Sequence, residues 1–318
     1  MTVIKTINSE YFLVNEYFQY FHEYRALKQN LFYFEEGADN YYKFFSNKGT
    51  LKNPDDTSYY TDFVTKYIKK EDNIGLIILG CGNSQRESRL LKDFYNRGYK
   101  LTYYGVDSSM SMLSLSIDIL RDCPYENYLV FADFASQEFK IDIKDITKKY
   151  DDNIYAFIDG TLGNVQQNHM ADTLNDIVRP GEKLWIEVLI RHSNTLYDDK
   201  IMFDKMYGTF FSANFTNFLL TPIRKMGIDE KAGSLGLELL REESLNALKF
   251  KSFFKVNSKT EINVKNSLIT LLPGSTIELL SVIVYDKDAL VRFFEERDFK
   301  LLDKTENGDR GQFLFQKQ

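Results

Sequence analysis

Short apolar runs alternate with amphipathic, helix-like segments through the middle of the chain. The five runs occupy residues 74–79, 101–106, 127–132, 154–158 and 184–190. Continuous apolar runs of this length are typical of strands that are buried on both faces of a parallel sheet. The intervening segments, such as 109–121 and 169–178, have the length and pattern of helices. The pattern therefore predicts an α/β fold with a Rossmann-like core of five parallel strands.

The flanking regions show a different pattern of hydrophobic residues. Residues 1–70 carry Tyr and Phe at spacings of three and four, which predicts several amphipathic helices, one of them starting near 56–58. Beyond the core, 203–220 is expected to be a helix that ends before Pro222. Further predicted elements are strands at 250–256, 260–264, 276–285 and 311–316 and a helix at 287–297.

These patterns suggest four parts. The late strands are expected to return to the first sheet, which would make the preceding region an inserted α+β segment that selects the substrate. The predicted parts are an N-terminal helical segment (1–70), the Rossmann-like core (71–190), the insertion (191–275) and C-terminal strands that complete the core sheet (276–318).

A glycine turn follows the first apolar run, with the sequence Gly80-Cys81-Gly82-Asn83-Ser84. Glycines permit a tight turn and a close approach of backbone to ligand, and the next helix would present unpaired N–H groups. Ser84 and Glu87 have the spacing of a capping box. Asp107 follows the second run, where a carboxylate can hold a ribose diol. The arrangement predicts a nucleoside-containing cofactor.

The identity of residue 85 narrows the choice of cofactor. Dinucleotide-binding turns carry a third glycine that allows close packing around a pyrophosphate, and Gln85 stands at that place. A bulky polar residue there fits a cofactor without pyrophosphate, such as S-adenosylmethionine. An NAD-linked oxidoreductase is correspondingly disfavoured.

Composition excludes several classes of protein. The chain of 318 residues has a net charge of −6 and is 43% hydrophobic, so it is expected to be soluble and has no general basic character for nucleic acid. Two cysteines, Cys81 and Cys123, and three histidines give little support to a metal site or a disulfide framework. No apolar run has membrane-spanning length, and no signal core is seen. We expect a cytoplasmic protein without a membrane partner.

With these residues laid out, the chain resembles the histidine-specific, S-adenosylmethionine-dependent methyltransferases, the family that includes the enzyme of ergothioneine biosynthesis. The turn resembles the family's Leu-Gly-Ser-Gly-Thr-Ser, and the most specific match is to its Ser-Thr-Ile-Gly-Asn. The segments that carry the resemblance are Leu79–Ser84, Val106–Ser109, Ala132–Phe134, Gly160–Asn164 and Arg179–Gly181.

The resemblance implies roles for individual residues. The cofactor would contact Gly80, Cys81, Gly82 and Ser84 around its methionine part, Asp107 and Ser108 at the ribose, and Asp133 and Phe134 at the adenine. Asn164 would hold the backbone groups of an amino acid substrate, with Tyr60, or Tyr59 in its place, nearby. Each residue also has a structural reading: Asp107 as a helix cap, Asp133 as a turn acid, Asn164 as a loop stabiliser, and Tyr60 and Cys81 as packing residues.

One departure bears on the substrate. The family reads an imidazole with a Glu-x-Ser pair on a late strand, whereas Glu278 and Ser281 are three residues apart. On a regular strand they would point to opposite faces, which disfavours histidine as the substrate and leaves the methyltransferase chemistry unaffected. The predicted function is N-methylation of an amino acid or related small amine. Methylation of another small metabolite, and a non-catalytic protein that binds S-adenosylmethionine or a partner, remain alternatives.

Overall fold

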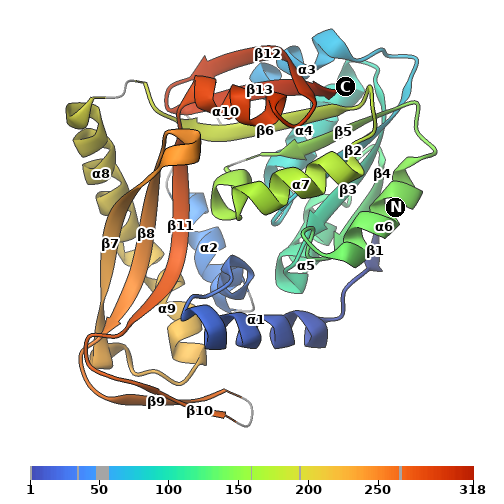
Figure 1. Cartoon of the computed structure of the whole chain (residues 1–318). Coiled ribbons are helices and arrows are strands. Elements are labelled where there is room, and N and C mark those ends of the chain that lie inside the picture. Colours follow the sequence, from blue (N-terminus) through green and yellow to red (C-terminus); the bar gives the residue numbers. More distant parts are fainter. Residues whose placement is uncertain (1, 34–35, 48–56, 159, 193–194, 265–266) are drawn as a thin grey trace. The chain divides into compact units, whose positions relative to one another are not determined.

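The computed structural model describes residues 2–33, 36–47, 57–158, 160–192, 195–264 and 267–318. Contacts between residues divide the chain into two compact units. Unit 1 comprises residues 1–9, 50–191 and 285–318, and unit 2 comprises 10–49 and 192–284. Each unit is therefore assembled from segments that are far apart in the sequence (Figure 1).

Unit 1 is built on a mostly parallel sheet. Its parallel strands lie in the order β1-β4-β3-β2-β5-β6, and β13 pairs antiparallel with β6 and with β12. The order reverses around β2, which is where open α/β sheets bind their ligands, beyond the carboxyl ends of the strands. The strands are β1 (Thr2–Thr6), β2 (Asn73–Leu79), β3 (Lys100–Asp107), β4 (Glu126–Phe131), β5 (Asp152–Phe157), β6 (Lys183–Ile190), β12 (Phe299–Asn307) and β13 (Arg310–Lys317).

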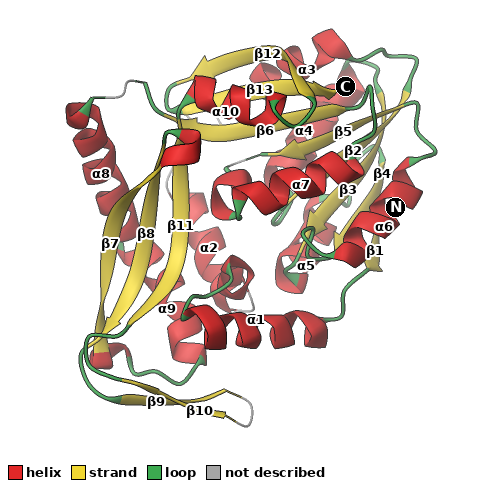
Figure 2. Ribbon diagram, in the orientation of Figure 1, coloured by secondary structure: helices red, strands yellow, loops and turns green. Residues whose placement is uncertain are grey.

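Helices cover both faces of this sheet (Figure 2). One layer contains α3, α4 and α5, and the other contains α6, α7 and α10. The helical elements are α3 (Ser58–Val64), η2 (Thr65–Tyr67), α4 (Gln85–Asn96), α5 (Met110–Ile119), α6 (Gln137–Thr147), η3 (Thr161–Asn164), α7 (Gln167–Ile177) and α10 (Lys287–Glu295).

Burial explains why the apolar runs form these strands. Residues 76–79 of β2 and 154–157 of β5 are fully buried, as expected for strands with a helix layer on each side. All five predicted strands of the core are confirmed, with ends shifted by at most two residues. The predicted α/β fold with a Rossmann-like core is likewise confirmed.

The paired strands of unit 2 are antiparallel. Strand β8 pairs with β7 on one side and β11 on the other, and β9 and β10 form a hairpin. The strands are β7 (Gly233–Glu242), β8 (Ala247–Val256), β9 (Thr260–Val264), β10 (Ser267–Leu271) and β11 (Thr276–Tyr285). The helical elements are α1 (Glu10–Tyr24), η1 (Gln29–Tyr33), α2 (Glu36–Asn47), α8 (Leu196–Phe210), α9 (Ala213–Lys225), η4 (Glu230–Ala232) and η5 (Glu243–Leu245).

Several elements differ from the prediction. The segment expected to be wholly helical begins with strand β1, whose side chains are partly exposed at the sheet edge, so its apolar signal is weak. The single helix predicted over 203–220 is two helices, and α9 continues through Pro222 to Lys225. The expected return of the late strands to the core sheet is confirmed by β13, which pairs with β6, and by its partner β12.

The expectation that Glu278 and Ser281 point to opposite faces of a strand is wrong. The register of β11 against β8 shifts between these two residues, so the strand carries a bulge. Ser281 Oγ donates a hydrogen bond of 3.2 Å to Glu278 Oε1. Ser252 closes the bulge, because its hydroxyl donates to the Leu280 carbonyl and accepts from the Leu280 N–H. The extra residue thus brings the carboxylate and the hydroxyl together.

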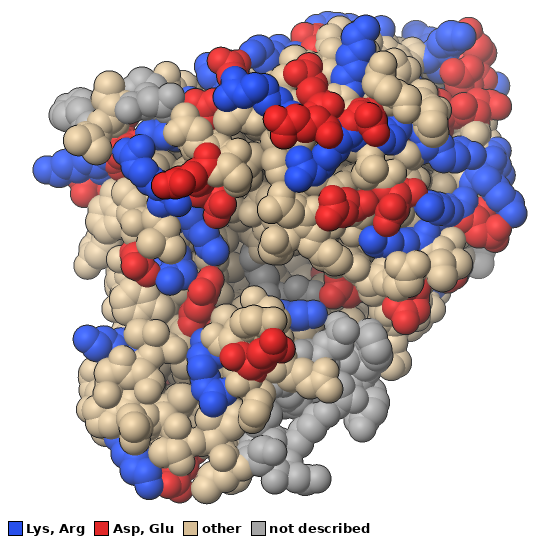
Figure 3. Space-filling model, in the orientation of Figure 1, with Lys and Arg blue, Asp and Glu red and all other residues tan. Residues whose placement is uncertain are grey.

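Charged side chains are mixed on the face of the molecule drawn in Figure 3, where Lys and Arg lie among Asp and Glu. Within the described part of the chain, no helix combines the length and the apolar character that crossing a membrane requires. The same residues contain no group of three or more His, Cys, Asp or Glu side chains placed to hold a metal ion.

Candidate functional site

The glycine turn lies at the carboxyl edge of the unit 1 sheet, directly after β2. Gly80 and Gly82 adopt positive φ angles of 76° and 54°. The N–H groups of Gly80 and Cys81 both donate to the Val106 carbonyl of the neighbouring strand. A Cβ atom at Gly80 would lie 2.5 Å from Thr161 Cγ2. Glycine is therefore required there by backbone geometry and by contact.

Asp107 is tied directly to this turn. Its Oδ2 accepts from the Gly82 N–H at 2.8 Å and its Oδ1 from the Ser109 N–H at 2.9 Å. Burial raises the pKa of Asp107 to about 6, although hydrogen bonds from the backbone of Gly82, Ser109 and Ser108 favour the charged form. An ionised carboxylate has about four lone-pair sites, so about one remains for a ligand beside these three backbone donors. Ser109 also caps α5.

The capping box predicted at Ser84 does not form. Ser84 has a left-handed backbone conformation with φ of 55° and makes no side-chain cap hydrogen bond. Its hydroxyl is fully buried and shares a hydrogen bond of 3.1 Å with the Tyr103 hydroxyl. Asn83 instead receives the Gln85 N–H. The side chain of Ser84 thus joins the turn to Tyr103 of β3 and does not cap α4.

Cys81 belongs to the same buried layer. Burial raises the pKa of its thiol well above the ordinary value, so the sulfur is a poor nucleophile. Gly105 makes room for it, since a Cβ atom there would lie 3.0 Å from Cys81 Sγ. The backbone N–H of Cys81 takes part in the turn, while its side chain is buried. This agrees with the interpretation of Cys81 as a packing residue.

Asp133 and Phe134 follow β4, the next strand along the edge. The Asp133 N–H donates to Asn8 Oδ1, and its own Oδ1 accepts from the Ala135 N–H. The ring of Phe134 is buried edge-on against Phe157, with centroids 5.9 Å apart. Asp133 is half-buried at the edge, while the Phe134 ring is part of the core.

Asn164 ends the short helix η3, which follows β5. η3 begins after Gly160, whose φ is 80°, and its Leu162 carbonyl accepts from the Tyr285 hydroxyl at 3.3 Å. Contact between Thr161 and the place of a Gly80 Cβ shows that η3 and the glycine turn are adjacent. Asn164 is half-buried at the end of this element.

Tyr60 lies in a buried ionic cluster that the sequence analysis missed. Its hydroxyl donates to Glu187 Oε1 at 2.9 Å, while Arg86 Nη1 contacts Glu187 Oε2 at 2.6 Å. Arg310 Nη1 donates to Glu187 Oε1 at 3.3 Å. Burial, together with the Glu187 charge, raises the pKa of Tyr60 well above its ordinary value. A signal was present, because Glu187 is the one charged residue inside the apolar run 184–190.

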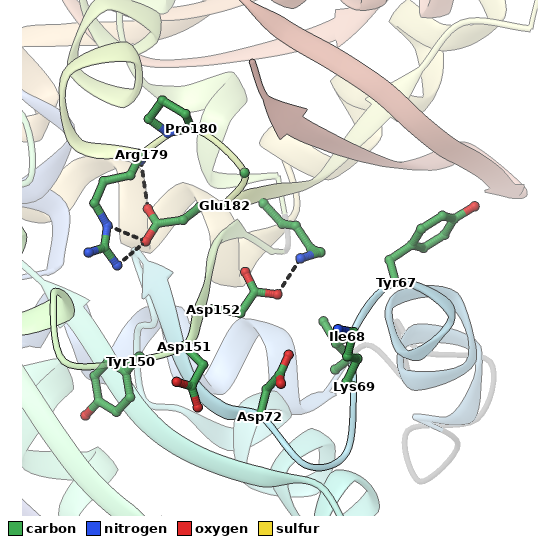
Figure 4. A pocket seen from close by; sticks show the side chains of 12 residues that line it. Tyr67, Ile68, Lys69, Asp72, Tyr150, Asp151, Asp152, Arg179, Pro180 and Glu182 are labelled. Atoms are coloured by element: carbon green, nitrogen blue, oxygen red, sulfur yellow. Dashed lines mark hydrogen bonds and ion pairs between the residues drawn. The ribbon is translucent and has the colours of Figure 1, made fainter.

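A cavity of about 480 Å³ lies at the opposite, amino edge of the same sheet (Figure 4). Its charged side chains are largely paired with one another: Arg179 with Glu182, and Lys183 with Asp152. Pro180 and Gly181 form the turn beside them. None of the residues predicted to contact a cofactor or substrate lines this cavity.

The carboxyl edge has the donors and acceptors that a nucleoside bearing an amino acid group requires. Gly80 and Gly82 leave two positions of the turn without side chains, and Asp107 retains acceptor capacity for a ligand hydroxyl. Arg86, in the first turn of α4, places a cation beside the turn. The residues present therefore fit S-adenosylmethionine.

A family model described as "Histidine-specific methyltransferase, SAM-dependent" matches residues 21–186, just over half of the chain. No curated protein matches the sequence significantly.

Several solved structures are similar to this chain at low sequence identity. An S-adenosylmethionine-dependent methyltransferase from Clostridium acetobutylicum is 14% identical, with 87% of this chain and 98% of that chain covered and a TM-score of 0.47. A methyltransferase from Methanosarcina mazei is 11% identical (80% and 96% covered, TM-score 0.43). The glycopeptide N-methyltransferase MtfA, complexed with S-adenosylhomocysteine, is 10% identical (82% and 87% covered, TM-score 0.42).

Proposed function

Because the chain belongs to the histidine-specific, S-adenosylmethionine-dependent methyltransferase family, we propose that it methylates a nitrogen atom of an amino acid or related small amine. The observation that carries the proposal is the link between Asp107 and the Gly82 N–H, which joins the acid and the glycine turn into one cradle. Gly80, Cys81, Gly82 and Ser84 would surround the cofactor's amino acid part. Asp107 and Ser108 would hold its ribose, and Asp133 with the Phe134 backbone its adenine.

The chemistry needs positioning more than acid–base catalysis. When bound, S-adenosylmethionine would supply a methyl group on a positively charged sulfur, and the site would have to hold a neutral amine nitrogen facing it. Holding the reactants in that geometry can lower the barrier by about 7 to 11 kcal/mol. Asn164 and Tyr60 would orient the amine. Because the pKa of Tyr60 is raised, the residue stays a neutral phenol and does not act as the base.

The substrate assignment draws on Glu278 and Ser281. Their side chains meet at the β11 bulge and lie beside Lys249, whose Nζ is 3.8 Å from Glu278 Oε1. A carboxylate with a hydroxyl beside it can read the N–H groups of a polar side chain such as an imidazole. This pairing supports an amino acid with a nitrogen-containing side chain as the acceptor.

Calorimetric titration with S-adenosylhomocysteine tests the cofactor site. Removal of the charged partner in Asp107→Ala should cost about 1.5 to 3 kcal/mol, a loss of affinity of roughly 10- to 150-fold. Asp151→Ala is the matched control, since Asp151 also accepts a backbone N–H, from Asn73, but at the amino edge. Equal affinity in wild type and Asp107→Ala would contradict the proposed cradle.

A screen of acceptors tests the reaction. Wild-type protein, S-adenosylmethionine and single amino acids or amines, with L-histidine first, should give S-adenosylhomocysteine and an N-methylated product detectable by mass spectrometry. Tight cofactor binding without transfer to any acceptor would favour a non-catalytic binding protein instead.

A further inference from the structure

Glu187 is the centre of a cluster that joins three segments of unit 1. Its side chain is 1% exposed, and its two oxygens contact Tyr60 on α3, Arg86 on α4 and Arg310 at the start of β13. The exposed fraction of the side chain rises to 13% at Arg86 and 30% at Arg310. Solvent exposure within the cluster is thus lowest at Glu187 and highest at Arg310.

The chemistry of these groups fixes the direction of one hydrogen bond. A carboxylate paired with two guanidinium groups only accepts hydrogen bonds, and a tyrosine hydroxyl has a single hydrogen. The hydrogen of Tyr60 is therefore committed to Glu187. What the Tyr60 oxygen can still offer to a ligand is a lone pair.

The tyrosine is also held in place from its other sides. The Arg86 guanidinium lies over its ring, 5.4 Å from the centroid, and the Trp185 ring packs beside it. α3 itself is fastened to α4, because Thr61 bonds to Asp93 and Arg97 bridges Asp93 and Asp62. The ring of Tyr60 cannot move without breaking these contacts, so its oxygen is held in place beside Glu187.

We propose that Glu187 is a positioning residue that fixes Tyr60 as a hydrogen-bond acceptor and so selects an acceptor molecule with an N–H donor, its amine, at this position. The inference rests on the proposed function in placing Tyr60 against the substrate. It assigns to Glu187 a role in substrate selection that needs no direct contact with the substrate. A ligand that presents only a carbonyl or carboxylate oxygen would meet the lone pair of Tyr60 and be rejected.

The first experiment reads the Tyr60 hydroxyl itself. Protein labelled with ¹³Cζ-tyrosine gives a Tyr60 resonance that is identified by its absence in Tyr60→Phe. In Glu187→Gln this resonance should shift and should titrate at lower pH, because the neighbouring negative charge is gone. Glu182→Gln, which changes another buried, arginine-paired glutamate at the amino edge, should leave the resonance unchanged. An unchanged Tyr60 resonance in Glu187→Gln would overturn the proposal.

The second experiment measures how strongly the protein selects a ligand that has an amine. With S-adenosylhomocysteine present, wild type should bind L-histidine at least about tenfold tighter than imidazolepropionate, which lacks the amine; one lost hydrogen bond to a fixed partner accounts for that ratio. The ratio should fall toward one in Glu187→Leu, which, unlike Glu187→Gln, leaves the Tyr60 hydrogen without an acceptor at this position, with S-adenosylhomocysteine affinity retained. A ratio that is the same in both proteins would also contradict the proposal.

Two further results, failure of the wild type to bind the probes and failure of the variant to fold, have a different meaning. If wild type binds neither L-histidine nor imidazolepropionate, the proposed acceptor class fails, and the Tyr60 resonance alone decides the role of Glu187. If Glu187→Gln or Glu187→Leu does not fold, Glu187→Asp replaces it, since the shorter side chain keeps the negative charge between the arginines but withdraws it from Tyr60. The same shift of resonance and loss of selection are expected there.

Discussion

The two ends of the unit 1 sheet each bury a glutamate that is paired with arginine, and they do so in different ways. At the amino edge, Glu182 accepts from Arg179 Nε at 2.7 Å, from the Arg179 N–H at 2.8 Å and from Asn153 Nδ2 at 2.6 Å. At the carboxyl edge, Glu187 is held by Tyr60, Arg86 and Arg310, from two helices and a distant strand.

The difference lies in where the partners come from. Arg179 is three residues from Glu182, so the main partner of this glutamate lies in the same turn. The opposite charges of the two side chains neutralise each other. The partners of Glu187 are 101 to 127 residues away along the chain. Such an arrangement forms only in the folded unit. The same pair of residue types thus stabilises a turn at one end and joins α3, α4 and β13 to β6 at the other.

The largest effect that separates the two ends is expected from Gly80→Ala. The added Cβ would clash with Thr161 and the backbone would be strained at φ of 76°, so the turn must move. We expect affinity for S-adenosylhomocysteine to fall by on the order of 100-fold, since a displaced turn would lose about two hydrogen bonds to the cofactor, each worth roughly 1.4 kcal/mol. Calorimetry measures it.

Gly98→Ala is the control for backbone strain alone. Gly98 has a similar φ of 82°, but nothing lies within 4 Å of the place of its Cβ. It should lose about 1 to 2 kcal/mol of the free energy of unfolding without losing cofactor affinity. Equal affinities in the two variants would show that the turn does not contact the cofactor.

Glu182→Gln should destabilise the fold and leave the cradle intact. The change weakens charged hydrogen bonds to Arg179 and Asn153, which should lower the free energy of unfolding by about 1 to 3 kcal/mol. Urea unfolding measures this, and calorimetry should find the affinity for S-adenosylhomocysteine changed by no more than about twofold. A parallel loss of affinity would mean that the two ends of the sheet are coupled.

Cofactor affinity should depend on pH through Asp107. Its pKa is raised to about 6, so below that pH the carboxyl takes up a proton and loses acceptor capacity for the ribose. Affinity for S-adenosylhomocysteine should therefore fall as pH falls, by about tenfold between pH 7 and pH 5 if only the ionised form binds. Titrations across this range should show the change in wild type and a flat profile in Asp107→Asn.

The smallest effect is expected from Tyr103→Phe, beneath the turn. The variant removes the hydroxyl that bonds to Ser84 and should cost about 1 kcal/mol of the free energy of unfolding. A thermal or urea transition measures this loss. If affinity for S-adenosylhomocysteine falls more than the stability does, the buried layer helps to set the conformation of the turn.

The sequence allowed the core to be predicted because burial on both faces of a strand leaves a continuous apolar run, as in β2 and β5. It allowed the turn and Asp107 to be predicted because positive φ angles require glycine and the acid follows a recognisable strand. β1 was missed because an edge strand with partly exposed side chains has no such run. Ser84 was misassigned because a buried contact with Tyr103 outcompeted the local cap.

The remaining failures have a common cause. The bulge that joins Glu278 to Ser281 depends on Ser252, which is 28 residues from Leu280, and the Glu187 cluster depends on residues still more distant. Spacing along one strand cannot reveal contacts of this kind. A charged residue within an apolar run, as at Glu187, is the local sign that such a contact exists.

The division of the chain into interleaved segments also limits how the protein can be dissected. A single truncation point cannot release either unit intact, because unit 1 is made from residues 1–9, 50–191 and 285–318. A fragment ending near residue 191 would lack β13, and would leave the outer edge of β6 without that partner and Glu187 without Arg310. Shortened forms would therefore expose unpaired strand edges, which promote aggregation. Point substitutions in the whole chain are the informative route.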